Sequence, residues 1–268
     1  MDVSQLSDEE VETAARTSYV YLKNPKPEES DDYAKLMCQR YLRSKRGDEQ
    51  VALKKMKSTL KFRQSMQVED LMTAFDKEKR DDPANDDENG SVATELQASL
   101  ASKHMYVRGY DKEGRSTFVF LTRRVVSHDP EWSLKEALYT IERAIASSKA
   151  DDSSISAIVD LKDFSIKKAP PMDIGKAFLT TLRSHYAGHV KQIFIVDAPR
   201  SFRWLWNVLK AFVGTSTRDK IHFVSRKEQA LEAHYQSDQI PIRDNMVDLD
   251  LQRYFYDVPF DRPYESNS

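Results

Sequence analysis

Strand-like and helix-like segments alternate along residues 106–235, and this alternation restricts the fold more than any other feature. With helices between them, strands are expected at Phe118–Leu121, Ile155–Leu161, Gln192–Val196 and Ile221–Val224. The runs at 156–159 and 193–196 contain no alternating polar residues, which is typical of strands that are covered on both faces. Strands separated by helices predict a mostly parallel sheet, so we expect an α/β fold.

The helices between and after these strands are predicted from caps and periodicity. Asp129 caps a helix in which Pro130 occupies the tolerated first position. Further helices are expected at Pro171–Tyr186, Ser201–Val213 and Arg226–Tyr235, with a short one around Ser91–Ser102.

The first 75 residues predict a helical segment. Ser7 and Glu10 have the spacing of a capping box, which places a helix at Asp8–Leu22. A second helix is expected from Ser30 to Gly47, and a third from Asp48 to Met66.

Composition suggests where the chain is divided. Residues 76–89 hold seven acids and three bases with almost no aliphatic residue, so this segment cannot bury enough apolar surface to offset its ordering entropy. We therefore expect a helical segment at 1–75, an exposed acidic loop at 76–90, an α/β domain at 91–240 and a C-terminal tail at 241–268 that packs on the domain.

Few residues offer a nucleotide, metal or catalytic site. The seven glycines form neither G-x-x-x-x-G-K-[ST] nor G-x-G-x-x-G, and no G-x-S-x-G elbow is present. His185 and His189 could share a helix face as zinc ligands, but no acid follows the first histidine, so helix-end histidines are the preferred interpretation. Cys38 is interpreted as a small core residue. We expect no enzyme activity, no cofactor and no metal.

Two basic blocks make the near-neutral net charge of −2 misleading. Residues 35–63 hold ten bases and two acids, and residues 200–227 hold seven bases and one acid. Most of these side chains are expected on solvated helix faces. The alternative is a surface that attracts anionic phosphate, worth about 1 kcal/mol per base near an anionic membrane. Nucleic acid is not expected, because no recognised motif accompanies the charge.

The predicted helix 201–213 is apolar around most of its circumference. Its apolar residues are Phe202, Trp204, Leu205, Trp206, Val208, Leu209, Phe212 and Val213. Such a helix is either buried on several sides or in contact with an apolar phase. A core helix and a helix at a membrane interface both remain open, although two tryptophans beside basic residues suit an interface.

Four blocks of this sequence resemble the CRAL-TRIO lipid-binding family, in the branch typified by the yeast phosphatidylinositol/phosphatidylcholine transfer protein. The blocks are Leu36–Lys45 with the helix that ends at Leu60–Arg63, Asp111–Arg115, Ile158–Asp163, and the most specific one, Ile193–Val224. The resemblance covers about residues 30–235. The family's acidic residue before the Ile193 strand is Gly188 here, its proline after Arg115 is Ser116, and its carboxy-terminal L-P-x-x-x-G-G is absent, so the chain is a divergent member.

The resemblance implies a sheet floor, surrounding helices and a deep apolar pocket for one hydrophobic molecule. It also implies that the helix 201–213 is a movable gate over this pocket. The pocket lining expected on this basis consists of Phe118, Phe120, Ile158, Phe178, Leu182, Ile193 and Ile195.

The resemblance further implies three residues that contact a lipid headgroup. In members that bind phosphatidylinositol, a threonine and a lysine after the gate contact the inositol phosphate, and Thr217 and Lys220 occupy these positions. A basic residue from the amino-terminal helices corresponds to Lys45, where the family often has arginine.

These observations predict a monomeric protein that binds and exchanges one hydrophobic ligand. The expected ligand is a phospholipid, with a sterol or an isoprenoid as alternatives, and the expected partner surface is a membrane contacted transiently. A scaffold or interaction protein with the same fold is the competing hypothesis. No apolar run reaches the roughly 18 residues of a membrane span, and the single cysteine fits a reducing compartment, so a cytoplasmic, peripherally membrane-associated protein is expected.

Overall fold

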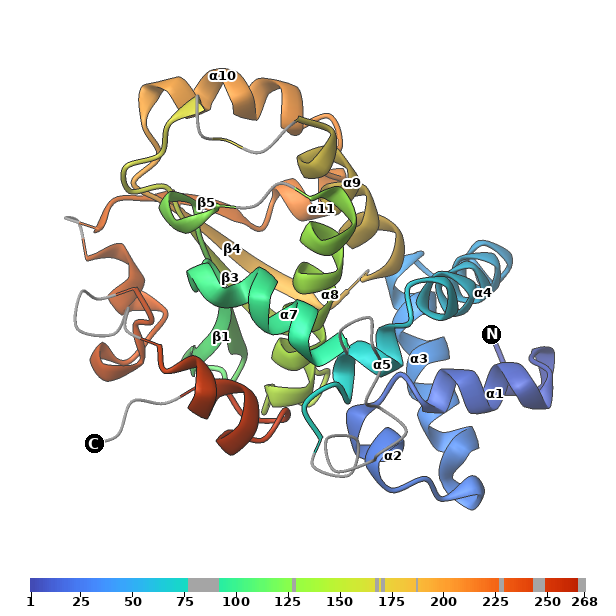
Figure 1. Ribbon diagram of the computed structural model, residues 1–268. Helices are drawn as coiled ribbons and strands as arrows, with labels where there is room; N and C mark the ends of the chain where they lie inside the picture. Colours follow the sequence, from blue (N-terminus) through green and yellow to red (C-terminus); the bar gives the residue numbers. More distant parts are fainter. Residues whose placement is uncertain are drawn as a thin grey trace.

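The computed structural model combines a helical unit with a five-stranded sheet and its helices (Figure 1). The residues that it describes are 1–76, 92–126, 129–166, 169, 172–186, 188–226, 229–242 and 249–264. Apart from Asp76, the predicted acidic loop at 76–90 lies outside these residues. Figure 1 shows α1 to α5 gathered at one side of the molecule and α10 at its top.

The amino-terminal segment is helical, as predicted. Its elements are η1 (Val3–Gln5), α1 (Asp8–Ala15), α2 (Tyr19–Lys23), η2 (Pro27–Glu29), α3 (Ser30–Ser44), α4 (Glu49–Ser65) and α5 (Val68–Met72). The capping box of Ser7 and Glu10 is present. The single helix predicted at Asp8–Leu22 is wrong, because Thr17 Oγ1 donates to Ala14 O and Ser18 adopts an extended conformation, which ends α1.

The sheet follows the predicted mixed α/β architecture. Its strands are β1 (Met105–Tyr110), β2 (Ser116–Leu121), β3 (Ile155–Asp160), β4 (Val190–Val196) and β5 (Ile221–Val224). They lie in sequence order, with β1 antiparallel to β2 and all other pairs parallel. In the β1–β2 turn the Asp111 carboxylate accepts from Glu113 N and Arg115 N, and Gly114 has a φ of 76°.

The remaining helices match the expectations with two corrections. They are α7 (Val92–Ser99), η4 (Leu100–Ser102), η5 (Thr122–Arg124), α8 (Pro130–Ser147), α9 (Met172–His185), α10 (Arg200–Leu209), α11 (Thr215–Arg218), η8 (Ala230–Ala233), η9 (Ser237–Gln239) and the π-helical η11 (Arg253–Asp257). The predicted helix at 201–213 ends at Leu209. The continuous helix predicted at Arg226–Tyr235 is wrong: Arg226 lies in a 3-10 turn, and the left-handed backbone of Gln229 separates it from the short η8.

The strands distribute their side chains between two faces of the sheet. Phe118 pairs with Ala157, Ala157 with Ile193, and Ile193 with Ile221, so these four residues share one face. We name it face A, and it also carries Phe120, Val159, Ile195 and Phe223. The opposite face, face B, carries Val119, Ile158, Phe194 and Val196.

The two faces are covered to different extents. Residues 229–242 lie against face B, where the rings of Tyr235 and Phe194 are 6.1 Å apart and Thr117 Oγ1 donates to Tyr235 Oη at 3.1 Å. The named face B residues have no exposed surface. On face A, several apolar residues stay partly exposed, and Phe223 is 51 % exposed; they are Phe120, Val159, Ile193, Ile221 and Phe223.

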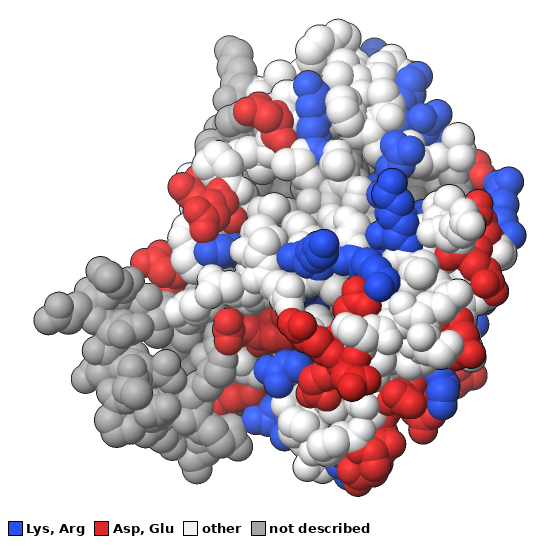
Figure 2. All heavy atoms as spheres, turned by 90° about the vertical axis from the view of Figure 1, so that its right-hand side faces the viewer, with Lys and Arg blue, Asp and Glu red and all other residues white. Residues whose placement is uncertain are grey.

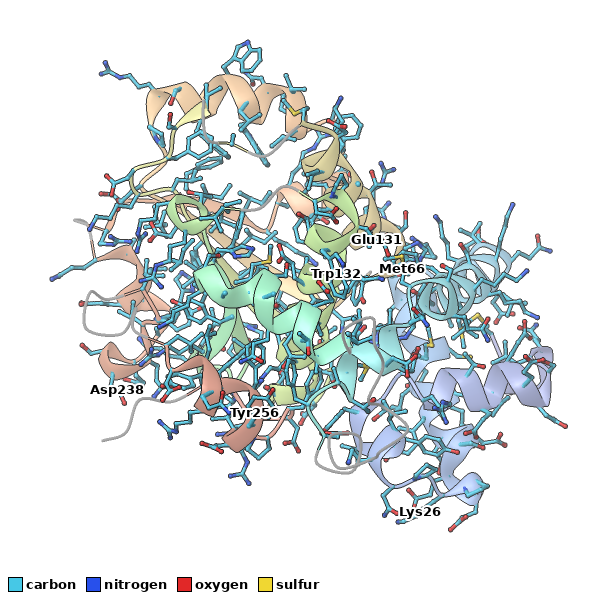
Figure 3. The ribbon with its side chains drawn as sticks, in the orientation of Figure 1. Lys26, Met66, Glu131, Trp132, Asp238 and Tyr256 are labelled. Carbon is cyan, nitrogen blue, oxygen red and sulfur yellow. The ribbon has the colours of Figure 1, made fainter. Side chains whose placement is uncertain are left out.

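The C-terminal segment contributes aromatic side chains to the core rather than only covering it. Its buried residues are Leu249, Tyr254, Phe255, Phe260 and Tyr264. The buried Arg143 of α8 donates to the carbonyl oxygens of Tyr254 and Val258, at 2.8 and 2.9 Å. Tyr256 Oη donates to Gln97 Oε1 of α7 at 3.3 Å, and its place beside α7 is seen in Figure 3.

A buried ion pair joins the helical unit to the sheet domain. The Arg63 guanidinium of α4 contacts the Glu142 carboxylate of α8 and also donates to Glu69 Oε1 at 2.8 Å. Tyr186 Oη donates to Glu142 Oε1 at 2.7 Å. Arg63 and Glu142 are 5 % and 2 % exposed, so each charge depends on the other in a region that excludes water.

A second contact joins α3, α4 and the end of α9. Tyr41 Oη lies 2.5 Å from Thr59 Oγ1 and donates to His185 O at 3.0 Å. His185 Nδ1 lies 3.1 Å from Thr59 Oγ1, and its ring stacks on Phe62 with centroids 4.0 Å apart. Burial and, secondly, the Lys55 charge lower the pKa of His185 to about 4.

Replacing Arg63 by methionine should lower the free energy of unfolding by about 3 kcal/mol, because the Glu142 carboxylate then stays buried without its cation. The control is Lys57→Met, which removes the partly exposed ion pair with Glu10 and should cost less than about 1 kcal/mol. Urea unfolding followed by circular dichroism measures both. Equal losses in the two variants would show that the buried pair adds nothing special.

Acidification should destabilise the fold through His185. Between pH 6.5 and about 4 the unfolded chain protonates this histidine and the folded chain does not, so stability is lost as the pH falls through this window. His185→Phe keeps a ring on Phe62, and its unfolding free energy should change less between pH 7 and pH 5 than that of the wild type. Identical pH slopes in the two proteins would contradict this assignment.

Candidate functional site

One side of α10 packs against face A of the sheet. Phe202 is buried with Ile195 and Leu161, and its ring lies edge-on to Phe164 with centroids 5.7 Å apart. The ring centroids of Trp206 and Phe223 are 5.6 Å apart. Thus α10 lies over the part of face A where strand residues remain partly exposed.

The residues predicted on the gate helix differ in their exposure. Phe202 is buried, and Trp204 is 63 % exposed. The others are partly exposed: Leu205, Trp206, Val208, Leu209 and Phe212. Because Trp204 faces solvent, α10 is not a helix buried on all sides.

Most of the predicted lining residues surround the same region, but Ile158 does not. Face A carries Phe118, Phe120, Ile193 and Ile195, and α9 contributes the partly exposed Phe178 and Leu182. Ile158 pairs with Val119 and Phe194 and therefore lies on face B. Ile158 therefore cannot line the same pocket as the other six residues, because successive residues of a strand point to opposite faces of the sheet.

Two cavities lie away from this region. One, of about 270 Å³, is lined by amino-terminal residues that include Val3 and Cys38. The other, of about 160 Å³, lies between Tyr19, α8 and the C-terminal segment. Neither is lined by a residue predicted for the pocket or the headgroup.

The predicted headgroup residues come from separate elements near the start of β4 and β5. Thr217 belongs to α11 and is partly exposed, and Lys45 follows α3. Lys220 Nζ donates to Val190 O at 2.7 Å, so this cation already holds the start of β4. Burial, followed by the nearby Lys191 charge, lowers the pKa of Lys220.

Gly188, which stands where the family has an acid, leaves space that is bounded by Arg40. A Cβ at Gly188 would lie 3.4 Å from Arg40 Cγ, and the residue has a φ of 89°. Arg40 Nη1 lies 2.7 Å from His189 Nε2, while His189 Nδ1 lies 3.2 Å from Ser153 O. His189 and His185 thus have different partners, and no cluster of three or more metal-ligating side chains is found within the described parts of the chain.

A serine–histidine–glutamate sequence of contacts also exists, inside the core. Ser102 Oγ lies 2.5 Å from His104 Nδ1, and His104 Nε2 lies 2.9 Å from Glu136 Oε1. His104 and Glu136 are 3 % and 4 % exposed, and Ser99 also donates to Glu136. This network joins η4 and α7 to α8, which is a packing role.

Two cations near the headgroup residues were not selected from the sequence. Lys55 of α4 and Arg183 of α9 both lower the pKa of Lys45, after the larger effect of burial. A Cβ at Gly214 would lie 3.7 Å from Arg183 Nε, which places Arg183 beside the start of α11. On the side of the molecule that carries the amino-terminal helices, most Lys and Arg side chains lie in the upper and middle part and most Asp and Glu side chains lie below (Figure 2).

Comparison with known proteins agrees with this architecture. A family model described as CRAL/TRIO domain matches residues 100–243, more than half of the chain. A solved structure, that of Sfh5, has a TM-score of 0.62 at 13 % identity and covers 86 % of this chain and 79 % of its own. At this identity the likeness concerns the fold alone. In the described residues, no helix is long and apolar enough to cross a membrane.

Three curated relatives span more than this chain does. A CRAL-TRIO domain-containing protein of Schizosaccharomyces pombe is 21 % identical over 57 % of this chain and 15 % of its own length. A phosphatidylinositol/phosphatidylcholine transfer protein of Arabidopsis thaliana is 24 % identical over 76 % of this chain and 37 % of its own length. A phosphatidylinositol transfer protein of Eremothecium gossypii is 26 % identical over 79 % of this chain and 47 % of its own length. The chain thus spans less than half the length of these relatives. With the family model matched over most of the sheet domain, the chain belongs to the CRAL/TRIO domain family.

Proposed function

We propose that this protein is a non-enzymatic carrier that binds one phospholipid between face A and α10 and exchanges it at a membrane. The observation that carries the proposal is the unequal cover of the sheet. The central residues of face B, Val119, Ile158, Phe194 and Val196, are buried, whereas Val159, Ile193 and Ile221 of face A stay partly exposed beneath α10. Two relatives are named as phosphatidylinositol transfer proteins, which supports a lipid as the ligand.

The energetics of lipid extraction explain why both surfaces must be apolar. Transfer of a lipid with about 30 methylenes from a bilayer to water costs roughly 24 kcal/mol of free energy, at about 0.8 kcal/mol per CH₂. A carrier therefore has to offer the acyl chains nearly as much apolar surface as the bilayer does. The face A residues and the inner side of α10, with Phe202, Leu205 and Trp206, supply it when the helix is closed.

The outer side of α10 suits contact with a membrane. Trp204 is 63 % exposed, the exposed Arg200 lies one helical turn before it, and the exposed Lys210 follows α10. An amphipathic indole beside basic residues favours the interface between headgroups and acyl chains. In this proposal, Trp204 enters the interface, α10 moves away from face A, and the lipid is exchanged.

The headgroup is expected to lie near the C-terminal end of α9, close to Thr217, Lys220 and Lys45. The Thr217 hydroxyl can donate to a phosphate oxygen, and Lys45 supplies a charge from the amino-terminal helices. Since Lys220 Nζ donates to a backbone carbonyl, it adds charge to this region while it holds β4 in place. The loss of an acid at Gly188 makes the region more favourable for anionic groups.

The purified full-length protein should contain about one equivalent of a phospholipid, seen by organic extraction and mass spectrometry. It should also transfer labelled phosphatidylcholine or phosphatidylinositol between liposomes. If the protein instead contains a sterol or an isoprenoid, the carrier function stands and the proposed ligand class is wrong. An empty protein that transfers none of these lipids would overturn the proposal and favour the scaffold hypothesis.

Trp204→Ser should lower the rate of lipid transfer between liposomes about tenfold, because the helix loses its interfacial anchor. The amount of lipid bound to the purified variant should stay unchanged. Leu36→Ser is the matched control, since Leu36 is 56 % exposed on α3 and lies outside α10. If both variants transfer lipid at the wild-type rate, α10 does not dock through Trp204.

A further inference from the structure

Three cations from three helices meet beside the proposed headgroup region. The hydrogen-bonded contacts among Tyr41, Thr59 and His185 bring α3, α4 and the end of α9 together. Lys45 lies one helical turn after Tyr41, and Lys55 lies one turn before Thr59, whose hydroxyl donates to Lys55 O at 3.1 Å. Lys45 and Lys55 therefore lie on the same sides of their helices as the residues that make the junction.

Arg183 extends this group towards α11. It lies two residues before His185 on α9, is exposed, and would contact a Cβ at Gly214. Thr217 N and Arg218 N both donate to Gly214 O, at 2.9 and 3.0 Å. Arg183 is thus placed between the junction of the three helices and Thr217.

These cations lack the acidic partners that several other lysines of the helical unit have. Lys26, Lys35 and Lys57 each form an ion pair, with Glu29, Asp32 and Glu10 respectively. Over the described ranges, no carboxylate forms an ion pair with Lys45, Lys55 or Arg183. Burial and then the charges of Lys55 and Arg183 lower the pKa of Lys45, as expected when like charges are close together.

We infer that the carried lipid has a phosphomonoester on its headgroup in addition to the phosphodiester, and that Lys55 and Arg183 select it. This inference rests on the proposed function. A diester carries one negative charge, which would leave most of the positive charge of Lys45, Lys55 and Arg183 uncompensated. A monoester adds about −1.5 to −2 at pH 7 and three strong acceptor oxygens, so a headgroup with both groups approaches the charge of the three cations. Because position 188 is a glycine, no carboxylate at this position repels the anionic headgroup.

The test compares dioctanoyl phosphatidylinositol with dioctanoyl phosphatidylinositol 4-phosphate by titration calorimetry on the full chain. The wild type should bind the 4-phosphate at least about tenfold more tightly. Lys55→Met and Arg183→Gln should each lower this preference about fivefold or more, because each weakens binding of the 4-phosphate much more than binding of phosphatidylinositol. Lys61→Met is the matched control. Lys61 is an exposed residue of the same helix α4, and its charge lowers the pKa of Glu10 rather than that of Lys45.

Each outcome has a separate meaning. Equal affinity for both lipids in the wild type, or an unchanged preference in both variants, would overturn the inference while the carrier function stands. Binding of neither lipid would overturn the inference, and it would remove the proposed function as well only if phosphatidylcholine is not bound either. Inositol 1,4-bisphosphate, which has no acyl chains, should bind far more weakly than the lipid; equal affinity would assign the three cations to a free phosphate ester and contradict a lipid ligand.

Discussion

The structure depends on the different cover of the two faces of one mostly parallel sheet. Parallel strands with apolar side chains on both faces need both faces covered. Here residues 229–242 cover the central part of face B, where Tyr235 and Phe194 lie against each other. On face A, part of the cover is the single helix α10, whose outer side carries an exposed tryptophan. The proposed lipid site lies on the side of the sheet where α10 covers apolar residues that stay partly exposed.

In our proposal the amino-terminal helices also position charge at the headgroup. Arg63 and Glu142 hold α4 against α8 by a buried ion pair, and the contacts of Tyr41, Thr59 and His185 hold α3 and α4 against α9. Lys45 and Lys55 depend on this junction for their position beside Arg183. The apolar and the cationic parts of the site are therefore built by different sections of the chain, which meet at α9.

Sequence patterns predicted the elements with strong local signals. The strand at Ile221–Val224, the helix capped by Asp129 and the capping box at Ser7 were all predicted correctly. The errors arose where a feature that no sequence pattern reports decided the outcome, as at Gln229, whose left-handed backbone interrupts the helix predicted at Arg226–Tyr235. For the same reason Ile158 was included in the pocket, since the side of a strand is known only from its register. Lys55 and Arg183 were missed because only the folded chain brings their helices together.

A photo-reactive phospholipid tests the central claim most directly. The lipid carries a diazirine near the end of one acyl chain, is loaded into the full-length protein and is irradiated, and the labelled peptides are mapped by mass spectrometry. Labels on face A and on the inner side of α10, at residues such as Val159, Ile193 and Leu205, are the predicted result. Labels on Ile158 or Phe194 of face B, or around the 160 Å³ cavity near Tyr19, would contradict the account.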